Sequence, residues 1–265
     1  MNLSLGFSPC PNDTFTFHAL VHGLVTSPGL SFTPRLEDVE TLNRLATGGL
    51  LDVSKVSYGA LPALLPEYAP LASGGALGRG CGPLLVAREP TPLEELEEAR
   101  IAIPGVHTTA NLLLRLYRPE LPAGIEKPYH QIMPAVAAGQ ADAGLIIHES
   151  RFTYRRHGLV RLADLGEWWE GETGLPIPLG AVVARRSLGA EGLKRVEGLI
   201  SRSVAHARHN PRDSRDYVRR HSRELDEGVI RSHINLYVND FSLALGSEGE
   251  RAVQELIKRA QEVAF

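Results

Sequence analysis

The sequence has little cysteine, with only Cys10 and Cys81 among 265 residues. The two thiols form no Cys-x-x-Cys pair and stand at no metal-ligand spacing from a histidine, so we expect neither a metal site nor a redox dithiol. Disulfides are uncommon in the cytosol, and we expect both cysteines to be free thiols. The pattern therefore does not favour a small secreted domain held together by disulfides.

Long apolar runs and an excess of one charge are also missing. No stretch approaches the roughly 18 consecutive apolar residues that a spanning helix needs, so we expect no membrane partner. The 28 Lys and Arg residues nearly match the 31 Asp and Glu residues, for a net charge of -3, which does not favour nucleic acid as a partner. Residues 1–7 contain no basic segment leading into a long apolar one, so we expect a cytoplasmic protein.

Several well-known catalytic motifs are absent too. The sequence contains no phosphate-binding loop and no Gly-x-Gly-x-x-Gly that follows a strand and opens a helix. It also lacks the His-Glu-x-x-His of zinc proteases and the Gly-x-Ser-x-Gly turn of serine hydrolases. These absences argue against nucleotide binding, zinc proteolysis and serine hydrolysis.

The sequence does contain short apolar strands that alternate with amphipathic helices, a pattern typical of α/β proteins. Hydrophobic residues make up 43% of the chain, enough for a buried core, and its length favours two modest units. The alternation restarts at Arg100 and gives way to helices after Arg186. We therefore predict a first lobe of residues 1–88 and 185–265, a second lobe of residues 89–184, and a ligand cleft between them.

The boundary between the lobes is expected near a glycine-rich stretch. Five glycines between residues 74 and 82 predict a flexible turn before the apolar strand Pro83–Ala87. We expect the chain to cross between the lobes near Ala87 and again near Leu179. The helices after Arg186 should then pack back on the first lobe.

Polar groups follow the predicted strands of the first lobe, at the edge where open α/β sheets bind ligands. Asn12 and Asp13 come after the first strand, either as ligand-binding groups or only as caps of the next helix. Lys55, Val56 and Ser57 end a later strand, where backbone N–H groups and a hydroxyl suit an anionic ligand. An ordinary helix cap at Ser57 and a solvated charge at Lys55 explain the same residues equally well.

The second lobe repeats this arrangement after its own first strand. The strand ends at Pro104-Gly105, and an apolar helix begins close to Thr109, which places Thr108, Thr109 and Ala110 at a helix N-terminus. Two helix N-termini that face one cleft would hold a carboxylate well.

His148 directly follows the apolar strand 143–147 and should emerge at the ligand-binding edge of the sheet. A histidine there can act as a base near neutral pH, because its unperturbed pKa is about 6.5. A structural histidine that bonds a loop is the alternative. Other histidines compete for the role, but none stands at the end of so clearly buried a strand: His18, His22, His107, His130 and His157.

Five motifs in order along the first two-thirds of the chain resemble those of one family. They are SPCPNDTF at 8–15, KVS at 55–57, GRGCGPL at 78–84, TTA at 108–110 and IHE at 147–149. The return strand 174–180 fits as well, whereas the helical C-terminal third adds little specificity. On these motifs the chain resembles the 1,4-dihydroxy-6-naphthoate synthases of the futalosine route to menaquinone.

The resemblance implies a fold similar to type II periplasmic binding proteins, used inside the cell as an enzyme. The family's carbon–carbon lyase converts cyclic dehypoxanthine futalosine to 1,4-dihydroxy-6-naphthoate by general-base-initiated fragmentation and aromatisation, without metal or cofactor. The resemblance also implies that His148 is the proton acceptor. It implies a substrate site lined by Lys55, Val56, Ser57, Thr109 and Ala110, to which we add Asn12, Asp13 and Thr108 from their positions.

Two other functions remain open. One is a non-catalytic carboxylate-binding protein of the same fold, and the other is the related dehydratase of the same pathway. Fold alone cannot separate binding from catalysis. The absence of an export signal argues against an extracytoplasmic transport component, and His148 at the cleft edge argues for chemistry. The expected partner is in each case a small molecule.

Overall fold

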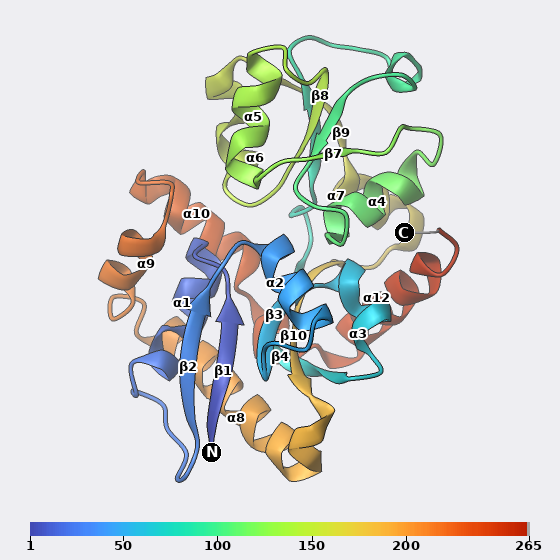
Figure 1. The fold of residues 1–265 in the computed structure, drawn as a ribbon. Helices are drawn as coiled ribbons and strands as arrows, with labels where there is room; N and C mark the ends of the chain where they lie inside the picture. Colours follow the sequence, from blue (N-terminus) through green and yellow to red (C-terminus); the bar gives the residue numbers. More distant parts are fainter. Residues whose placement is uncertain (264–265) are drawn as a thin grey trace.

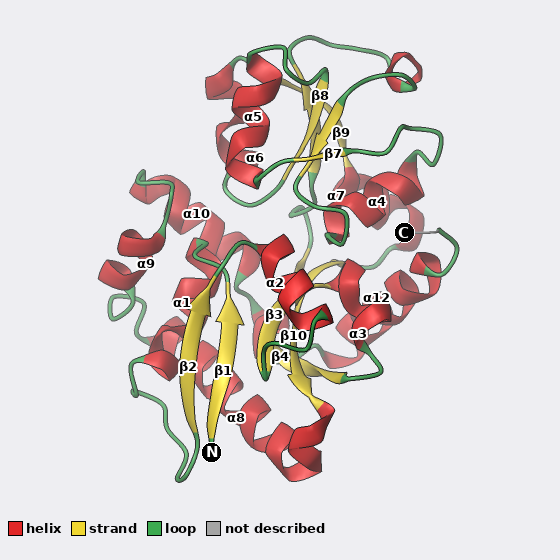
Figure 2. Cartoon of the chain, viewed as in Figure 1, coloured by secondary structure: helices red, strands yellow, loops and turns green. Residues whose placement is uncertain are grey.

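The computed structural model of the protein describes residues 1–263 and has two lobes, each built on one five-stranded sheet (Figures 1 and 2). The strand order in the first sheet is β2-β1-β3-β10-β4. Its strands are β1 (Asn2–Phe7), β2 (Ser31–Leu36), β3 (Val53–Ser57), β4 (Tyr68–Gly78) and β10 (Ile177–Arg185). The α/β class expected from the sequence is confirmed.

The second sheet repeats the pattern of the first, in the order β7-β6-β8-β5-β9. In each sheet three parallel strands are followed by a strand that runs antiparallel to both of its neighbours, β10 in the first sheet and β5 in the second. The strands are β5 (Leu84–Ala87), β6 (Ile101–Ile103), β7 (Ile125–Glu126), β8 (Ala143–Ile146) and β9 (Val160–Asp164). Because β5 follows β4 and β10 returns from the second lobe, the chain crosses between the lobes twice.

Helices surround both sheets (Figure 2). The helices of the first lobe are α1 (Pro11–Val21), α2 (Val39–Thr47), η1 (Tyr58–Ala60), α3 (Leu61–Leu64), η4 (Arg186–Leu188), α8 (Gly189–His209), α9 (Arg215–His221), α10 (Glu227–Tyr237), α11 (Asp240–Leu243) and α12 (Gly246–Ala260). Those of the second are η2 (Leu93–Leu96), α4 (Thr109–Tyr117), α5 (Tyr129–Ala137), α6 (Ser150–Thr153), η3 (Tyr154–His157) and α7 (Leu165–Thr173). Within residues 1–263, no helix has both the length and the apolar character needed to cross a bilayer.

The sequence of α2 shows why these elements form where they do. The Asp38 carboxylate accepts hydrogen bonds from the backbone N–H groups of Glu40 and Thr41, both at 3.1 Å, and so satisfies two donors that have no partner inside the helix. Leu42 and Ala46 lie one turn apart and are buried against the sheet. The cap and the apolar stripe together fix the helix beside β3, which it contacts.

The largest core cluster crosses the boundary between the lobes. It joins Tyr58 and Leu61 of the first lobe to Leu112 of α4 and Trp169 of α7, and it includes Leu256 of α12. Full burial of one leucine side chain, such as Leu61 or Leu112, stabilises the fold by about 1.5–3 kcal/mol. The helix α12 contacts η1, α3 and β10 of the first lobe and also α4 of the second. An apolar contact therefore joins the lobes beside the two segments of chain that cross between them.

The flexible turn predicted for the glycine-rich stretch is wrong over residues 74–78. These residues belong to β4, which pairs with β10 along most of its length. Gly74 has a φ of +81°, and a Cβ there would lie 2.7 Å from Ile200 Cγ2 and 2.8 Å from Val182 Cγ2. Glycine is required at this position by backbone conformation and close packing, not by flexibility.

The strand pairing places the lobe boundaries at other residues than the sequence pattern predicts. β5 pairs with β8 and β9, so residues 84–87 lie in the second sheet, whereas the sequence pattern predicts the first lobe for them. β10 pairs with β3 and β4, so residues 177–184 lie in the first sheet. An apolar run shows that a strand is buried but not which sheet it joins, which explains the difference. We propose lobes of residues 1–79 with 177–263, and of residues 80–176.

Gly74→Ala is expected to lower the free energy of unfolding by about 1–3 kcal/mol more than Gly29→Ala does. Both glycines have positive φ, so both variants incur the cost of a left-handed alanine. Only at Gly74 would the new methyl group meet other atoms, because nothing lies within 4 Å of a Cβ built at Gly29. Urea unfolding of the two variants measures the difference, and equal losses would contradict the packing explanation.

Candidate functional site

A cavity of about 80 Å³ lies between the two lobes. Its walls include the last residues of β3 and residues that follow β1, β6 and β8, together with single residues or pairs from β4, β10, α2 and α10. Strand ends of both sheets therefore meet there. All the residues proposed from the sequence line this one cavity: Asn12, Asp13, Lys55, Val56, Ser57, Thr108, Thr109, Ala110 and His148. Their roles stay a prediction, but their convergence makes this cavity the candidate site.

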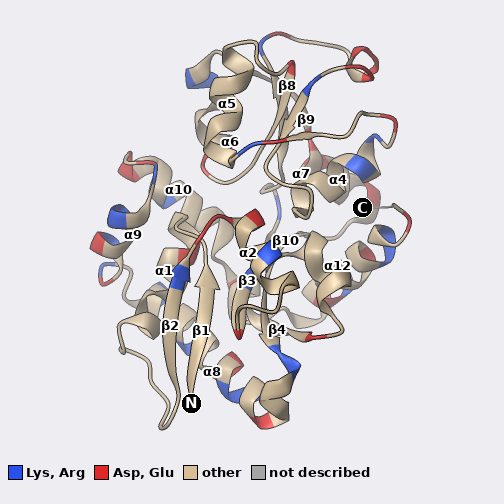
Figure 3. Cartoon of the chain, in the orientation of Figure 1, with Lys and Arg blue, Asp and Glu red and all other residues tan. Residues whose placement is uncertain are grey.

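A larger groove of about 940 Å³ lies on the first lobe alone, among α8, α9 and α10. Arginine side chains line it, and some of them pair with acids, as Arg215 does with Glu227 at 2.7 Å and Arg208 with Asp240 at 2.9 Å. Figure 3 shows both signs of charge along the outer helices such as α8. None of the residues singled out by the sequence lines this groove, so the smaller interlobe cavity is the better candidate.

The first-lobe side of the cavity is built on a buried acid–base pair. The Asp13 carboxylate accepts hydrogen bonds from the Ser8 hydroxyl at 2.7 Å and from the Asn12 amide at 2.9 Å. Lys55 Nζ lies 3.5 Å from Asp13 Oδ1 and donates to the Gly74 carbonyl at 2.6 Å. Burial lowers the pKa of Lys55, and Asp13 opposes that shift. Asn12 and Asp13 are thus not caps of α1, whose N-cap is Cys10.

Ser57 is held by a side chain that sequence reasoning missed. Its backbone N–H donates to Asn43 Oδ1 at 2.8 Å, and its hydroxyl oxygen accepts from Asn43 Nδ2 at 3.1 Å. The hydroxyl makes no cap to the short η1 that follows, so the cap interpretation of Ser57 is wrong. Because Asn43 uses the oxygen as an acceptor, the hydroxyl proton is left to donate into the cavity.

The second-lobe side of the cavity is the N-terminus of α4. Thr108 caps this helix, because its hydroxyl accepts from Asn111 N at 3.2 Å and donates to the Gly105 carbonyl at 2.7 Å. Thr109 uses its hydroxyl across the lobe boundary, donating to Leu179 O at 2.7 Å and accepting from Gly59 N at 3.0 Å. The backbone N–H groups of Thr109 and Ala110 have no acceptor inside a helix, so they are free of helical hydrogen bonds at the cavity.

The expected second helix N-terminus is not a full helix. The segment after Ser57 is η1, a single turn of three residues, followed by α3 of four residues. So short a segment develops little of the dipole of a regular helix. The first lobe therefore offers the Lys55 ammonium and the Ser57 hydroxyl in place of a helix end.

His148 lies just after β8, and its side chain lines the cavity. Its φ is +56°, and it is the one non-glycine residue within 1–263 with positive φ, a conformation that costs of order 1–3 kcal/mol. Its ring meets Tyr129 edge-on at 5.0 Å and stacks over His233 at 6.1 Å between centroids. Burial lowers the pKa of His148, and nearby Glu149 and Asp13 only partly oppose this. The imidazole is therefore neutral near pH 7 and able to accept a proton.

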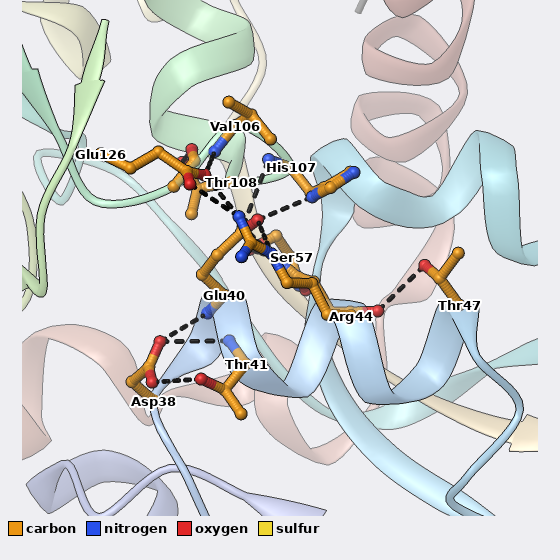
Figure 4. Close-up of polar contacts among 12 residues, drawn as sticks. Asp38, Glu40, Thr41, Arg44, Thr47, Ser57, Val106, His107, Thr108 and Glu126 are labelled. Carbon is orange, nitrogen blue, oxygen red and sulfur yellow. Dashed lines mark hydrogen bonds and ion pairs between the residues drawn. The ribbon is translucent and has the colours of Figure 1, made fainter.

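None of the five competing histidines lines the cavity. His107 lies at its rim, where its Nδ1 is 2.7 Å from Glu40 Oε1 (Figure 4). Beside it, Arg44 binds both carboxylate oxygens of Glu126 at 2.7 Å. These two contacts join α2 of the first lobe to the second lobe.

Three buried groups that support the site carry almost no local signal in the sequence. Asn43 lies on α2, Tyr129 begins α5 and His233 lies on α10, each within an otherwise ordinary helical pattern. His233 does stand out as one polar residue in the apolar stripe Val229, Ile230 and Ile234. A polar residue in a buried stripe needs a partner, and that is the only hint in the sequence.

Comparison with known proteins shows the family of the chain. The sequence profile of a family described as menaquinone biosynthesis matches residues 3–262. A 1,4-dihydroxy-6-naphthoate synthase of Thermus thermophilus is 55% identical over 98% of this chain and 94% of its own length. The enzyme of the same name from Streptomyces coelicolor is 49% identical over 97% of this chain and 92% of its own length.

Solved structures show the same architecture. A crystal structure of an Archaeoglobus fulgidus protein has a TM-score of 0.93 and 35% identity, covering 98% of this chain and 97% of its own. An alkanesulfonate-binding protein of Xanthomonas axonopodis, with a TM-score of 0.68 and 18% identity, covers 100% of this chain and 94% of its own. The second likeness confirms the expected periplasmic-binding-protein-like fold. The chain belongs to the menaquinone-biosynthesis family that includes the 1,4-dihydroxy-6-naphthoate synthases.

Proposed function

We propose that the protein is a 1,4-dihydroxy-6-naphthoate synthase that acts in the cytoplasm on cyclic dehypoxanthine futalosine. The reaction is a lyase reaction in which a base removes one C–H proton, the sugar-derived part is lost and a naphthoate ring forms. The high identity to synthases of two bacteria supports this proposal. The observation that carries it is the neutral imidazole of His148 in a cavity lined by anion-binding groups.

The proposed base is His148, because its position and its protonation state both suit the task. A base must be unprotonated at the working pH and must reach the substrate. Burial lowers the pKa of His148 and keeps the imidazole neutral, and the residue lines the cavity. A positioned base contributes about 10²–10⁴-fold, so orientation of the substrate must supply much of the remaining acceleration.

The proposed carboxylate anchor lies between the lobes. Lys55 and Ser57 approach from the first lobe, and the N–H groups of Thr109 and Ala110 approach from the second. Hydrogen bonds from charged or well-oriented donors to a carboxylate are about twice as strong as neutral ones. An anchor shared by both lobes would fix the fused ring beside His148.

The cavity volume implies that the lobes separate to admit the substrate. About 80 Å³ corresponds to a few water molecules at about 30 Å³ each, whereas sites for small molecules commonly measure about 300–1,000 Å³. The rim contacts Glu40–His107 and Arg44–Glu126 and the Thr109–Leu179 bond would break on opening. We therefore take this structure as the closed form.

His148→Asn is expected to lower kcat by about 100-fold or more and to change KM little, because it removes an interaction made only in the transition state. His157→Asn, the same change at an exposed histidine outside the cavity, serves as the control and should leave kcat unchanged. Turnover is followed as naphthoate formed from cyclic dehypoxanthine futalosine. A His148→Asn protein with more than about a tenth of the parent kcat would refute the assignment of the base.

The pH profile should show an acid limb that lies below the free imidazole value of about 6.5. Protonation removes the base, and burial lowers the pKa of His148, so kcat/KM should fall as the pH drops through a midpoint below 6.5. The residual activity of His148→Asn should lack this limb. A limb centred above pH 6.5, or one that survives the substitution, would point to another group.

Ser57→Ala is expected to weaken binding of 1,4-dihydroxy-6-naphthoate by about tenfold to hundredfold, since a hydrogen bond to a charged group contributes about 1.5–3 kcal/mol. The matched control is Ser54→Ala on the same strand, whose hydroxyl bonds the Lys55 carbonyl at 3.0 Å and does not line the cavity. Isothermal calorimetry measures both affinities. Equal affinities in the two variants would remove Ser57 from the carboxylate anchor.

A further inference from the structure

A chain of buried polar groups runs behind His148 and crosses the boundary between the lobes. From the second lobe, the Tyr129 hydroxyl donates to Glu149 Oε1 at 3.1 Å. From the first lobe, His233 Nε2 lies 2.8 Å from Asn12 Oδ1. The two halves meet where His233 Nδ1 lies 3.8 Å from Glu149 Oε2. His148 is the residue directly before Glu149, so the chain passes immediately beside the proposed base.

The hydrogen bonds of Asn12 fix the tautomer of His233. Asn12 Nδ2 donates to the Asp13 carboxylate at 2.9 Å, so Asn12 Oδ1 is an acceptor. His233 Nε2, bonded to that oxygen, must therefore carry a hydrogen. In a neutral imidazole the other nitrogen, Nδ1, then presents a lone pair. This lone pair faces Glu149 Oε2.

Glu149 Oε2 and His233 Nδ1 are both buried, and neither has a hydrogen-bond partner within residues 1–263. If Glu149 were ionised and His233 neutral, two acceptors would face each other in a buried site, which is costly. One proton between the two atoms would satisfy both and would draw the 3.8 Å separation toward hydrogen-bond length. We propose that Glu149 and His233 hold one shared proton across the lobe boundary and that this pair positions His148.

Burial of His233 disfavours the proton on the imidazole side of the pair. Burial lowers the pKa of His233 well below its ordinary value, and His148 adds to that effect. Burial also raises the pKa of Tyr129, so its phenol keeps its proton and remains a donor to Glu149. A neutral carboxylic acid that donates to a neutral imidazole leaves no uncompensated charge in the interior.

The pair can position the base because it fixes the residue next to it. The positive φ of His148 is costly and persists only where the surroundings determine the backbone fully. Tyr129 and His233 hold the Glu149 carboxyl from opposite lobes, and the same two rings flank the His148 imidazole. Lobe closure, which brings His233 to Glu149, thus also sets the orientation of the base.

A shared proton also affects the charge that His148 experiences. An ionised Glu149 would raise the pKa of His148, as Asp13 and Asp38 do from the first lobe, whereas Lys55 lowers it. With the proton on the Glu149–His233 pair, Glu149 contributes no charge and the imidazole stays neutral more readily. Cys10, whose Sγ lies 3.9 Å from the Tyr129 hydroxyl, adds no charge near His148, because burial raises the pKa of its thiol and the thiol keeps its proton.

Spectroscopy of the protein without substrate tests the shared proton directly. The infrared difference between the parent protein and Glu149→Gln at pH 7 is expected to show the carbonyl stretch of a protonated carboxyl, and exposed Glu98→Gln is expected not to show it. Nitrogen NMR should find His233 with Nε2 protonated. A doubly protonated His233 would mean an ionised Glu149 and would overturn the proposal. An ionised Glu149 beside a singly protonated His233 would overturn the proposal.

Kinetics test the positioning role, which rests on the proposed role of His148. Glu149→Gln imitates the protonated acid, because its amide can donate to His233 and accept from Tyr129, so it should keep kcat within about threefold and leave the acid limb unmoved. Glu149→Ala should lower kcat at least about tenfold with little change in KM.

A Glu149→Gln protein that loses as much activity as Glu149→Ala would overturn the proposal. A shift of its acid limb to lower pH would do the same, because it would reveal a negative charge removed from beside His148. If Glu149→Ala does not fold, the acid limb of the pH profile of Glu149→Gln and the infrared and NMR spectra still test the proposal. The spectra need no substrate, so they remain decisive even if the synthase reaction is not observed.

Discussion

Buried polar groups need partners, and several of those at the cavity of this protein meet their partners in the opposite lobe. Thr109 bonds Gly59 and Leu179, His107 bonds Glu40, and Glu149 faces His233. A buried donor or acceptor left without a partner costs about 1–3 kcal/mol. In the proposed closed form Thr109 and His107 have their partners, so closing the lobes would satisfy these two groups and assemble the site in one step. A ligand that supplied the same hydrogen bonds would stabilise the same closed arrangement.

Much of the fold could be predicted because local signals are consistent with it. The strand predicted at residues 143–147 coincides with β8 to within one residue, and the helix predicted to begin close to Thr109 matches α4 with its Thr108 cap. The errors arise where tertiary contacts decide. Gly74 lies within β4 and not in a turn. It is glycine because Val182 and Ile200 leave no space for a side chain. The apolar run at 84–87 predicts a buried strand but does not say which sheet contains it. Only its pairing with β8 and β9 assigns it to the second sheet.

The sequence predicts the residues of the candidate site that lie at strand ends. It does not predict the supporting residues that lie within helices. Residues at strand ends converge for a topological reason, so the sequence pattern alone predicts that Lys55, Thr109 and His148 face one cleft between the two sheets. Asn43 and His233 act through contacts 14 and 221 residues away in sequence. Neither spacing nor composition encodes such contacts, and a polar residue in an apolar helical stripe is the only trace of them.

The same architecture serves binding proteins, so the fold supplies a cleft and not a reaction. The alkanesulfonate-binding protein shares the architecture at 18% identity. A site that only binds an anion needs donors such as Ser57 and the N-terminus of α4, and it gains nothing from a strained, desolvated imidazole beside them. At His148 the chain bears a backbone cost of order 1–3 kcal/mol and holds the ring between Tyr129 and His233. The proposed proton abstraction would account for that cost, because a base must be neutral, fixed and shielded from water when the substrate arrives.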